Sequence, residues 1–216
     1  LTVAPEELAR AFNLTLVPEF VPRYNIAPTQ NALVITGGRP AEAQFMRWGL
    51  IPSWSKDPAI GTKLINARSE SAREKPAFRT ALKRRRCIIP ASGFFEWQAM
   101  AGGKQPLYIT VADLPLLALA GLWESWRDPA GLDVRTFTIL TTAANDFMRS
   151  FHDRMPVILQ RDDWPVWMDQ AEVPEAVLEG LMERPFEPER MRAVPVSKVV
   201  NKPAVDSPEC IAPISA

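Results

Sequence analysis

Twenty-one prolines punctuate this 216-residue chain, and they limit its fold more than any other feature of the sequence. Proline lacks an amide hydrogen and has a fixed φ angle, so a helix interior or a central strand rarely accommodates it. Most of the prolines fall between segments of regular apolar pattern, and three of them lie in residues 17–30 alone. We therefore expect short elements joined by loops, and such loops commonly carry function on a rigid scaffold.

The segments between the prolines predict more strands than helices. Apolar and β-branched runs predict strands at residues 32–36, 43–50, 87–90, 93–100, 106–112, 116–125, 135–142 and 191–197. Helices are expected at residues 6–12, 143–151, 162–168 and 173–184, together with a helix over 69–85 that is interrupted at Pro76. Antiparallel strands separated by turns, with helices mainly outside them, predict an α+β fold on a barrel-like sheet. The length fits one domain, residues 1–216.

Several classes of protein are disfavoured by composition. No apolar stretch reaches the roughly 18 residues of a membrane helix, and the first residues lack the pattern of a signal peptide. Cys87 and Cys210 form neither a disulfide framework nor a metal cluster, and with a single histidine a zinc site is not expected. We therefore expect a cytoplasmic protein without membrane anchor, metal or cofactor. Nothing in the sequence indicates a coiled coil, and we expect a monomer.

The charges are balanced overall but unevenly distributed. Between Lys63 and Arg86 there are nine Lys or Arg residues and two Glu, a net charge of +7, and the rest of the chain carries −7. Such an asymmetry can be the contact surface for a polyanion such as nucleic acid. A solvated helical face explains it equally well, and the sequence leaves the two readings open.

Four segments place polar residues where packing alone does not require them. Asn25 lies in a loop bounded by prolines, and Asn66 ends an apolar run in "LINARSE" (64–70). Glu96 stands among aromatic residues in "GFFEW" (93–97), where strand alternation puts it on the face of Phe94. Burial beside an aromatic ring would raise the pKa of this carboxyl, whereas an edge-strand acid facing water would not shift. His152, the one histidine, begins "HDRMP".

Taken together, these segments resemble a known family. "WGLIPSW" (48–54), "INARSE" (65–70), "RRCIIPASGFFEW" (85–97) and "HDRMPVIL" (152–159) are similar in order and spacing to motifs of the SOS response-associated peptidase (SRAP) family. The resemblance runs from about "RYNIAPTQ" (23–30) to the tail at 196–211. It implies a single α+β domain around an antiparallel β-barrel-like core with peripheral helices. It also implies covalent capture of abasic sites in single-stranded DNA during the DNA damage response, with scope for abasic-site lyase activity.

The resemblance also assigns residues. Asn66 is similar to the family's asparagine that holds the bound sugar, Glu96 to its catalytic acid, and His152 to the histidine that moves protons on the opened sugar. The expected DNA-contacting residues are Arg68, Arg79, Arg154, Trp54, Trp97, Asn25 and Pro28. Aromatic residues of this kind stack on bases, and arginines bind phosphates.

The nucleophile of the family is a cysteine that becomes residue one after removal of the initiator methionine, and this sequence begins with Leu1 instead. Neither Cys87 nor Cys210 replaces it, because the chemistry needs a cysteine with a free α-amine. We therefore expect the natural protein to carry a cysteine in a short segment before Leu1. Two alternatives remain open: a thiol autopeptidase that removes its own initiator methionine, and a non-covalent single-strand DNA-binding module.

Overall fold

Five strands close into a barrel in the computed structural model of the protein, which describes residues 1–38, 41–169 and 173–214. The order is β2 (Glu42–Trp48), β1 (Asn31–Thr36), β4 (Arg86–Ala91), β7 (Leu117–Arg127) and β8 (Asp133–Ala143). These neighbours pair antiparallel, and β2 returns to pair with β8 in parallel, through Arg47–Thr136 and Trp48–Phe137. The expected antiparallel barrel is therefore confirmed except at its closing seam.

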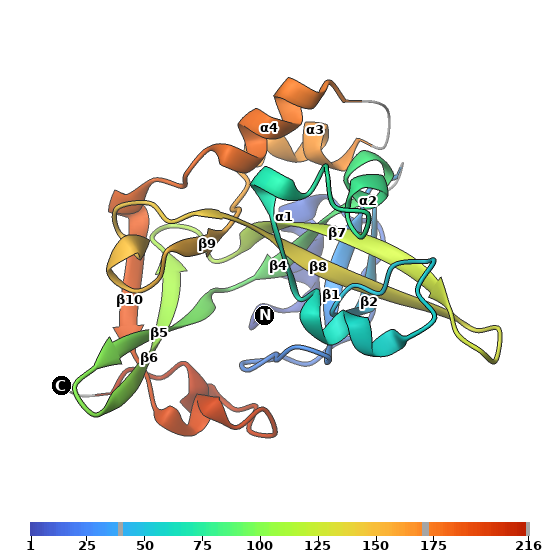
Figure 1. The fold of residues 1–216 in the computed structure, drawn as a ribbon. Helices are drawn as coiled ribbons and strands as arrows, with labels where there is room; N and C mark the ends of the chain where they lie inside the picture. Colours follow the sequence, from blue (N-terminus) through green and yellow to red (C-terminus); the bar gives the residue numbers. More distant parts are fainter. Residues whose placement is uncertain (39–40, 170–172, 215–216) are drawn as a thin grey trace.

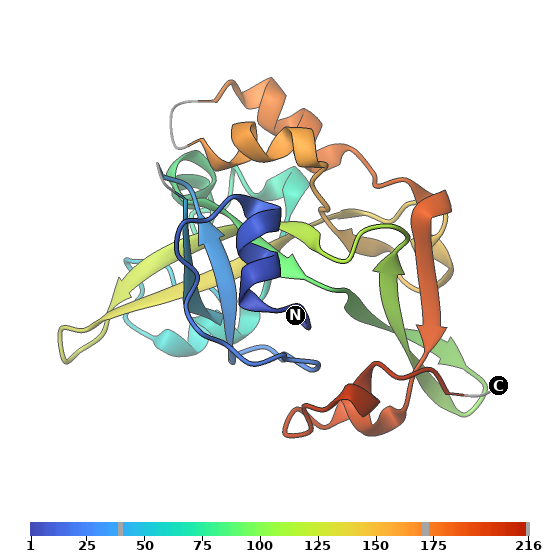
Figure 2. The same ribbon diagram turned by 180° about the vertical axis from the view of Figure 1, so that it is seen from behind.

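Two short strands also pair with β8, one on each of its edges, because Thr141 pairs with a residue of both. Beyond β2 it pairs in parallel with β3 (Asn66–Arg68), and near its end it pairs antiparallel with β9 (Arg154–Pro156). A second sheet has three antiparallel strands in the order β10 (Met191–Pro195), β6 (Gly103–Val111) and β5 (Phe94–Met100). Figure 1 and Figure 2 show this sheet standing beside the barrel, with the N-terminal end of the chain between them.

The helical elements are all short, with three to nine residues each. Four α-helices and seven 3-10 helices are described: α1 (Pro5–Phe12), α2 (Arg79–Arg84), α3 (Trp164–Met168), α4 (Glu175–Glu183), η1 (Pro58–Lys63), η2 (Ser69–Ser71), η3 (Met148–Ser150), η4 (Arg161–Asp163), η5 (Pro188–Arg190), η6 (Lys198–Asn201) and η7 (Pro208–Cys210). Both views place α2, α3 and α4 together at one end of the molecule, away from the three-stranded sheet (Figures 1 and 2).

The alternation of side chains along the barrel strands produces two buried clusters. In β7, Ala118 and Ala120 face a cluster that includes Trp167 of α3 and residues of α4. Leu117 and Leu119 face the other cluster, which includes strands of the three-stranded sheet. A strand buried on both faces reads as a nearly continuous apolar run, and this is the pattern of β7.

One local expectation was wrong. The helix expected over 143–151 is limited to the 3-10 turn η3, because the Asn145 side chain accepts the Met148 amide and donates to the Phe186 carbonyl. Pro90 lies inside a strand, as the strand expected at 87–90 predicts. Pro90 is tolerated in β4 because β1 pairs only with Cys87 and Ile88, so its missing amide falls beyond that ladder.

Candidate functional site

A cavity of about 650 Å³ lies between the barrel and the three-stranded sheet. Its walls come from both sheets, from the loop 23–28 near the start of the chain and from the C-terminal segment around η6. The first two described residues, Leu1 and Thr2, line it as well. Segments that are far apart in the sequence therefore meet at one hollow.

The cavity gathers most of the predicted site residues. Those that line it are Asn25, Pro28, Asn66, Glu96, Trp97, His152 and Arg154. Three predicted residues, all within the described ranges, are not part of its lining: Trp54, Arg68 and Arg79. The three residues expected to carry the chemistry thus lie in the cavity, while part of the expected DNA-contacting set lies outside it.

Glu96 reaches the cavity from β5, the edge strand of the smaller sheet. Phe95 and Trp97 lie on the other face of the strand, where Phe95 packs on Tyr108 with ring centroids 5.3 Å apart. Burial raises the pKa of Glu96 above its ordinary value, and nearby His152 partly opposes this shift. The predicted direction of the shift is therefore confirmed. A carboxyl with a raised pKa keeps its proton to higher pH and can donate it.

His152 lies in the short turn between η3 and β9, with its side chain half exposed. Its Nδ1 accepts the backbone amide hydrogen of Arg154 at 2.9 Å, which leaves the ring proton on Nε2. The same Nδ1 lies 3.1 Å from Oδ1 of Asp153. The neutral ring is thus oriented by the backbone, and the protonated ring has a carboxylate within reach, so both states of the imidazole have a partner.

Asn66 and Arg68 project from the same face of β3, since Ala67 between them is buried. Asn66 lines the cavity, and Glu70 two residues after Arg68 holds Arg154. This ion pair is bidentate, with N–O distances of 2.6 and 2.8 Å, and Arg154 also donates to the Thr141 carbonyl. The hydrogen bond from Arg154 lowers the pKa of Glu70. The two motifs "INARSE" and "HDRMP" are therefore joined across the site.

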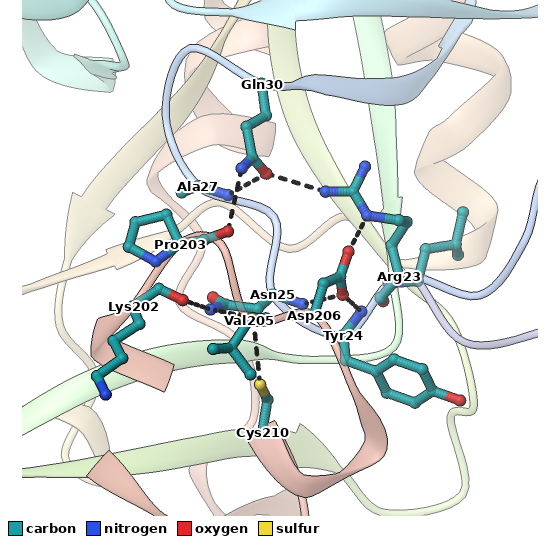
Figure 3. A network of polar contacts seen from close by, with 11 residues as sticks. Arg23, Tyr24, Asn25, Ala27, Gln30, Lys202, Pro203, Val205, Asp206 and Cys210 are labelled. Atoms are coloured by element: carbon teal, nitrogen blue, oxygen red, sulfur yellow. Dashed lines mark hydrogen bonds and ion pairs between the residues drawn. The ribbon is translucent and has the colours of Figure 1, made fainter. Parts of the chain in front are cut away.

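Asn25 is almost fully buried and ties the two ends of the chain together (Figure 3). Its amide nitrogen donates to the carbonyls of Val200, Lys202 and Val205, at 3.0, 3.3 and 3.0 Å. Its backbone amide donates to Asp206. We call this set of contacts between residues 23–30 and 200–206 the terminal clasp. It places the C-terminal segment as a wall of the cavity.

Asp206 is the acceptor at the centre of the terminal clasp. Its carboxylate accepts the backbone amides of Tyr24 and Asn25 at 2.6 and 2.9 Å and pairs with Arg23. Arg23 in turn donates to Gln30 at 2.9 Å. Burial opposes ionisation of Asp206, yet these hydrogen bonds bring the pKa of its carboxyl below the ordinary value.

The two predicted base-stacking tryptophans lie in different surroundings. Trp97 is 37% exposed at the rim of the cavity, where its indole nitrogen donates to Asn201 at 2.7 Å. Trp54 is 60% exposed in the loop before η1. An exposed aromatic face on a loop and another at a cavity rim both leave ring surface available for stacking on a base.

Sequence reasoning did not identify Glu70, Asp206 or Trp48 as residues that shape this site. Trp48 lines the cavity, donates to the Ile65 carbonyl at 2.8 Å and stacks on Phe137. Glu70 lies in the motif "INARSE", two residues after Arg68, which was expected to bind a phosphate. Its place in that motif could have indicated a role at the site. Asp206 had no such signal, because its partners are some 180 positions away in the sequence.

The cysteines lie outside this chemistry. Cys87 is fully buried in β4, and burial raises the pKa of its thiol well above the ordinary value. Cys210 is buried and its sulfur donates to the Val205 carbonyl at 3.5 Å. Within the described ranges, no cluster of His, Cys, Asp and Glu side chains could hold a metal ion. No helix in that part of the chain is both long and apolar enough to span a membrane.

Comparison with known proteins adds to this geometry. The family model described as SOS response associated peptidase (SRAP) matches residues 1–203. The chain is 42% identical over 211 residues to the abasic site processing protein YoqW of Bacillus subtilis, covering 95% of this chain and 94% of that one. It is 34% identical over 226 residues to the abasic site processing protein HMCES of Gallus gallus, covering 89% of this chain and 66% of the relative.

Solved structures show the same fold. A crystal structure of a Bordetella bronchiseptica protein superposes with a TM-score of 0.79 at 30% sequence identity, covering 91% of this chain and 97% of the other. A Bacteroides thetaiotaomicron protein gives a TM-score of 0.79 at 30% identity, covering 87% of this chain and 82% of the other. The single α+β domain with a barrel core is therefore an arrangement that experimentally determined structures share.

Proposed function

The chain belongs to the SOS response associated peptidase (SRAP) family, and from this premise we propose that it captures abasic sites in single-stranded DNA covalently. The observation that carries the proposal is the convergence of Asn66, Glu96 and His152 on one cavity from three separate segments. The relatives named abasic site processing proteins support the substrate class.

The proposed nucleophile is a cysteine that precedes Leu1 in the natural protein. Support comes from the position of Leu1 and Thr2 in the cavity wall, because a short segment before Leu1 would start at the site. An α-amine has a pKa of about 7.7–8, so a useful fraction is neutral at cytosolic pH. This amine attacks the aldehyde of the opened sugar, and loss of water gives an imine. The thiol then adds across the C=N bond: its sulfur bonds to the imine carbon, its proton goes to the nitrogen, and a five-membered thiazolidine closes.

Glu96 and His152 move the protons that these steps require. Opening the sugar transfers a proton from its hydroxyl to the ring oxygen, and expulsion of water requires a proton donor. Glu96, whose raised pKa favours the protonated form, donates. His152 serves in both directions, since the neutral ring accepts a backbone amide hydrogen and the protonated ring has a carboxylate within reach. Asn66 holds the sugar through its amide.

DNA contacts complete the proposal. Arg68 shares a face with Asn66 and reaches a phosphate, and Arg154, which lines the cavity paired with Glu70, contacts the strand together with that carboxylate. Trp54, Trp97 and Pro28 contact bases beside the lesion, and Asn25 acts through the terminal clasp. We propose a monomer that works in the cytoplasm, at the nucleoid when DNA is damaged. Abasic-site lyase activity and removal of the initiator methionine by the same cysteine are compatible with this chemistry.

The test uses the natural full-length protein, whose first residue is identified by intact mass. It is mixed with a labelled single-stranded oligonucleotide containing one abasic site and run on a denaturing gel, with an undamaged strand in parallel. We expect a shifted band with the abasic strand alone. Glu96→Gln and His152→Ala should each slow single-turnover crosslinking by ~10²–10⁴-fold. The affinity of each variant for the undamaged strand should stay within about threefold of that of the natural protein, because a residue that only transfers protons contributes little to binding.

The exposed Glu183→Gln is the matched control, because it removes a carboxylate outside the lining of the cavity. A first residue other than cysteine, together with no shifted band, would exclude covalent capture. Removal of the methionine without any shifted band would favour the autopeptidase. If Glu96→Gln weakens binding and crosslinking equally, Glu96 shapes the groove and does not transfer a proton.

A further inference from the structure

The basic segment between Lys63 and Arg86 divides into two groups in the fold. Three of its arginines have structural partners: Arg73 pairs with Glu175 and Glu179 of α4, and Arg85 pairs with Glu124 of β7 at 2.8 Å. Arg86 is buried and binds backbone carbonyls. Three of the nine cations of the segment therefore form contacts within the molecule.

Three other cations of the segment remain available on α2. Arg79, Lys83 and Arg84 are exposed, and within the described ranges their side chains have neither an ion-pair nor a hydrogen-bond partner. Positions 79 and 83 are one helical turn apart, so they lie on the same face of α2, with 84 adjacent. We call these three residues the α2 basic surface.

The α2 basic surface borders a hollow of its own. A cavity of about 680 Å³ lies between α2 and α4, lined by Arg79, Lys83 and Arg84 and by apolar residues of the α4 side. Its described lining contains one acid, Glu175, which is already paired with Arg73. The hollow thus has a marked excess of positive charge. It shares no lining residue with the cavity that holds Glu96 and His152.

Buried Arg86 keeps this surface rigid. Its guanidinium donates to the carbonyls of Leu82 and Lys83, at the end of α2, at 2.8 and 2.9 Å. It also donates to the carbonyls of Trp167 and Asp169, at the end of α3. A cation at the carboxyl ends of two helices stabilises both of them. The α2 basic surface is therefore fixed relative to the barrel, and the charge of Arg86 adds to its positive potential.

We propose that the α2 basic surface is a second phosphodiester contact, which binds the backbone of the same single strand beyond the lesion. This inference rests on the proposed function, which supplies the strand. The described lining of the hollow contains no aromatic side chain on which a base could stack, so the contact is with phosphates and is independent of sequence. The chain leads directly from β3, which carries Asn66 and Arg68, through η2 to α2 (Figure 1).

The test measures binding to single strands of increasing length that carry a stable abasic analogue near one end, at several salt concentrations. The lesion is placed at either end, so that the direction of the flanking strand is also tested. Each phosphate neutralised on a single strand contributes about 0.7 to the log–log slope of affinity against salt. Three contacts therefore add a slope of about 2 once the strand is long enough to reach α2.

The variant carries Arg79→Gln, Lys83→Gln and Arg84→Gln together. On long strands its slope should be about 2 smaller than that of the natural protein, which amounts to roughly 16-fold between 50 and 200 mM salt. On strands that span only the first cavity the two proteins should be equal. The control variant carries three exposed arginines changed to glutamine on other elements: Arg10, Arg127 and Arg161. Its slope should equal that of the natural protein at every length.

Equal slopes for the α2 variant and the natural protein at every length would overturn the proposal. A loss of slope on the shortest strands would overturn it as well, since the charges would then act through the first cavity. Inorganic phosphate is added as a competitor at matched ionic strength. If phosphate displaces the strand while strand length has no effect on the slope, the α2 basic surface is a small-anion site and the DNA contact is refuted. Failure of the proposed function has a separate signature, because crosslinking would be absent while undamaged strands still showed the length-dependent slope.

Discussion

Substitution of Asn25 by aspartate tests whether the terminal clasp, and not a DNA contact, is what this buried residue provides. The change replaces the amide nitrogen, which faces three backbone carbonyls, by an oxygen of the same size. Three acceptors then lose their donor, and the new carboxylate lies near Asp206 as well. An uncompensated charge of this kind in a buried site costs about 3–5 kcal/mol.

Two further variants separate charge from the loss of hydrogen bonds. Asn25→Ala removes the donor without introducing a charge, and unsatisfied buried acceptors cost about 1–3 kcal/mol. Asn31→Asp makes the same chemical change at an exposed position at the start of β1 and should be nearly neutral. The destabilisation by Asn25→Asp should also shrink in acid. Burial and the carbonyl oxygens raise the pKa of the new carboxyl in the folded state. The free-energy cost of its charge is therefore full above that pKa and vanishes below the pKa of an aspartate in the unfolded chain, near 3.9.

The assay combines urea unfolding at neutral and acidic pH with limited trypsin digestion. Release of the terminal clasp exposes the segment after β10, where Lys198 offers a cleavage site. We expect Asn25→Asp to be cut there faster than Asn25→Ala, and Asn31→Asp to behave as the natural protein. Equal unfolding free energies and equal cleavage for Asn25→Asp and Asn31→Asp would refute the reasoning.

Three other changes follow from the same structure. The pKa of Asp206 is lowered in the folded state, so its contribution to stability is present above the unfolded pKa and is lost as the pH falls through the folded pKa. Asp206→Asn should therefore flatten the acid limb of a plot of unfolding free energy against pH, and an unchanged limb would contradict this. Gly121→Ala in β7 places a Cβ 2.2 Å from Ile89 Cδ1 and 2.8 Å from the Thr138 carbonyl, and should destabilise the protein by about 1–3 kcal/mol. Gly180→Ala in α4 meets nothing within 4 Å and should stabilise it by about 0.4–1 kcal/mol, so equal melting temperatures for the two variants would count against the packing argument.

Local patterns in the sequence were sufficient for most of the elements, though not for β3, β9 or the helix expected over 143–151, and for the direction of one pKa shift. Alternation along "GFFEW" correctly put Glu96 on the face opposite Phe95 and Trp97, and its pKa shift has the predicted direction. The strand pattern led to the α+β barrel because period-two alternation and proline breaks are properties of neighbouring residues. The family motifs pointed to Asn66, Glu96 and His152, which share the cavity.

The tertiary structure alone decided which charges are paired and how the barrel closes. Arg73 and Arg85 form ion pairs with glutamates of α4 and β7, and Arg154 forms one with Glu70. Arg79, in contrast, is exposed. Nothing local distinguishes these arginines, because each partner arrives from a distant segment. The parallel seam between β2 and β8 and the terminal clasp have the same origin. Element type follows from near neighbours in the chain, whereas partner choice depends on which distant segments the buried core brings within a few ångströms.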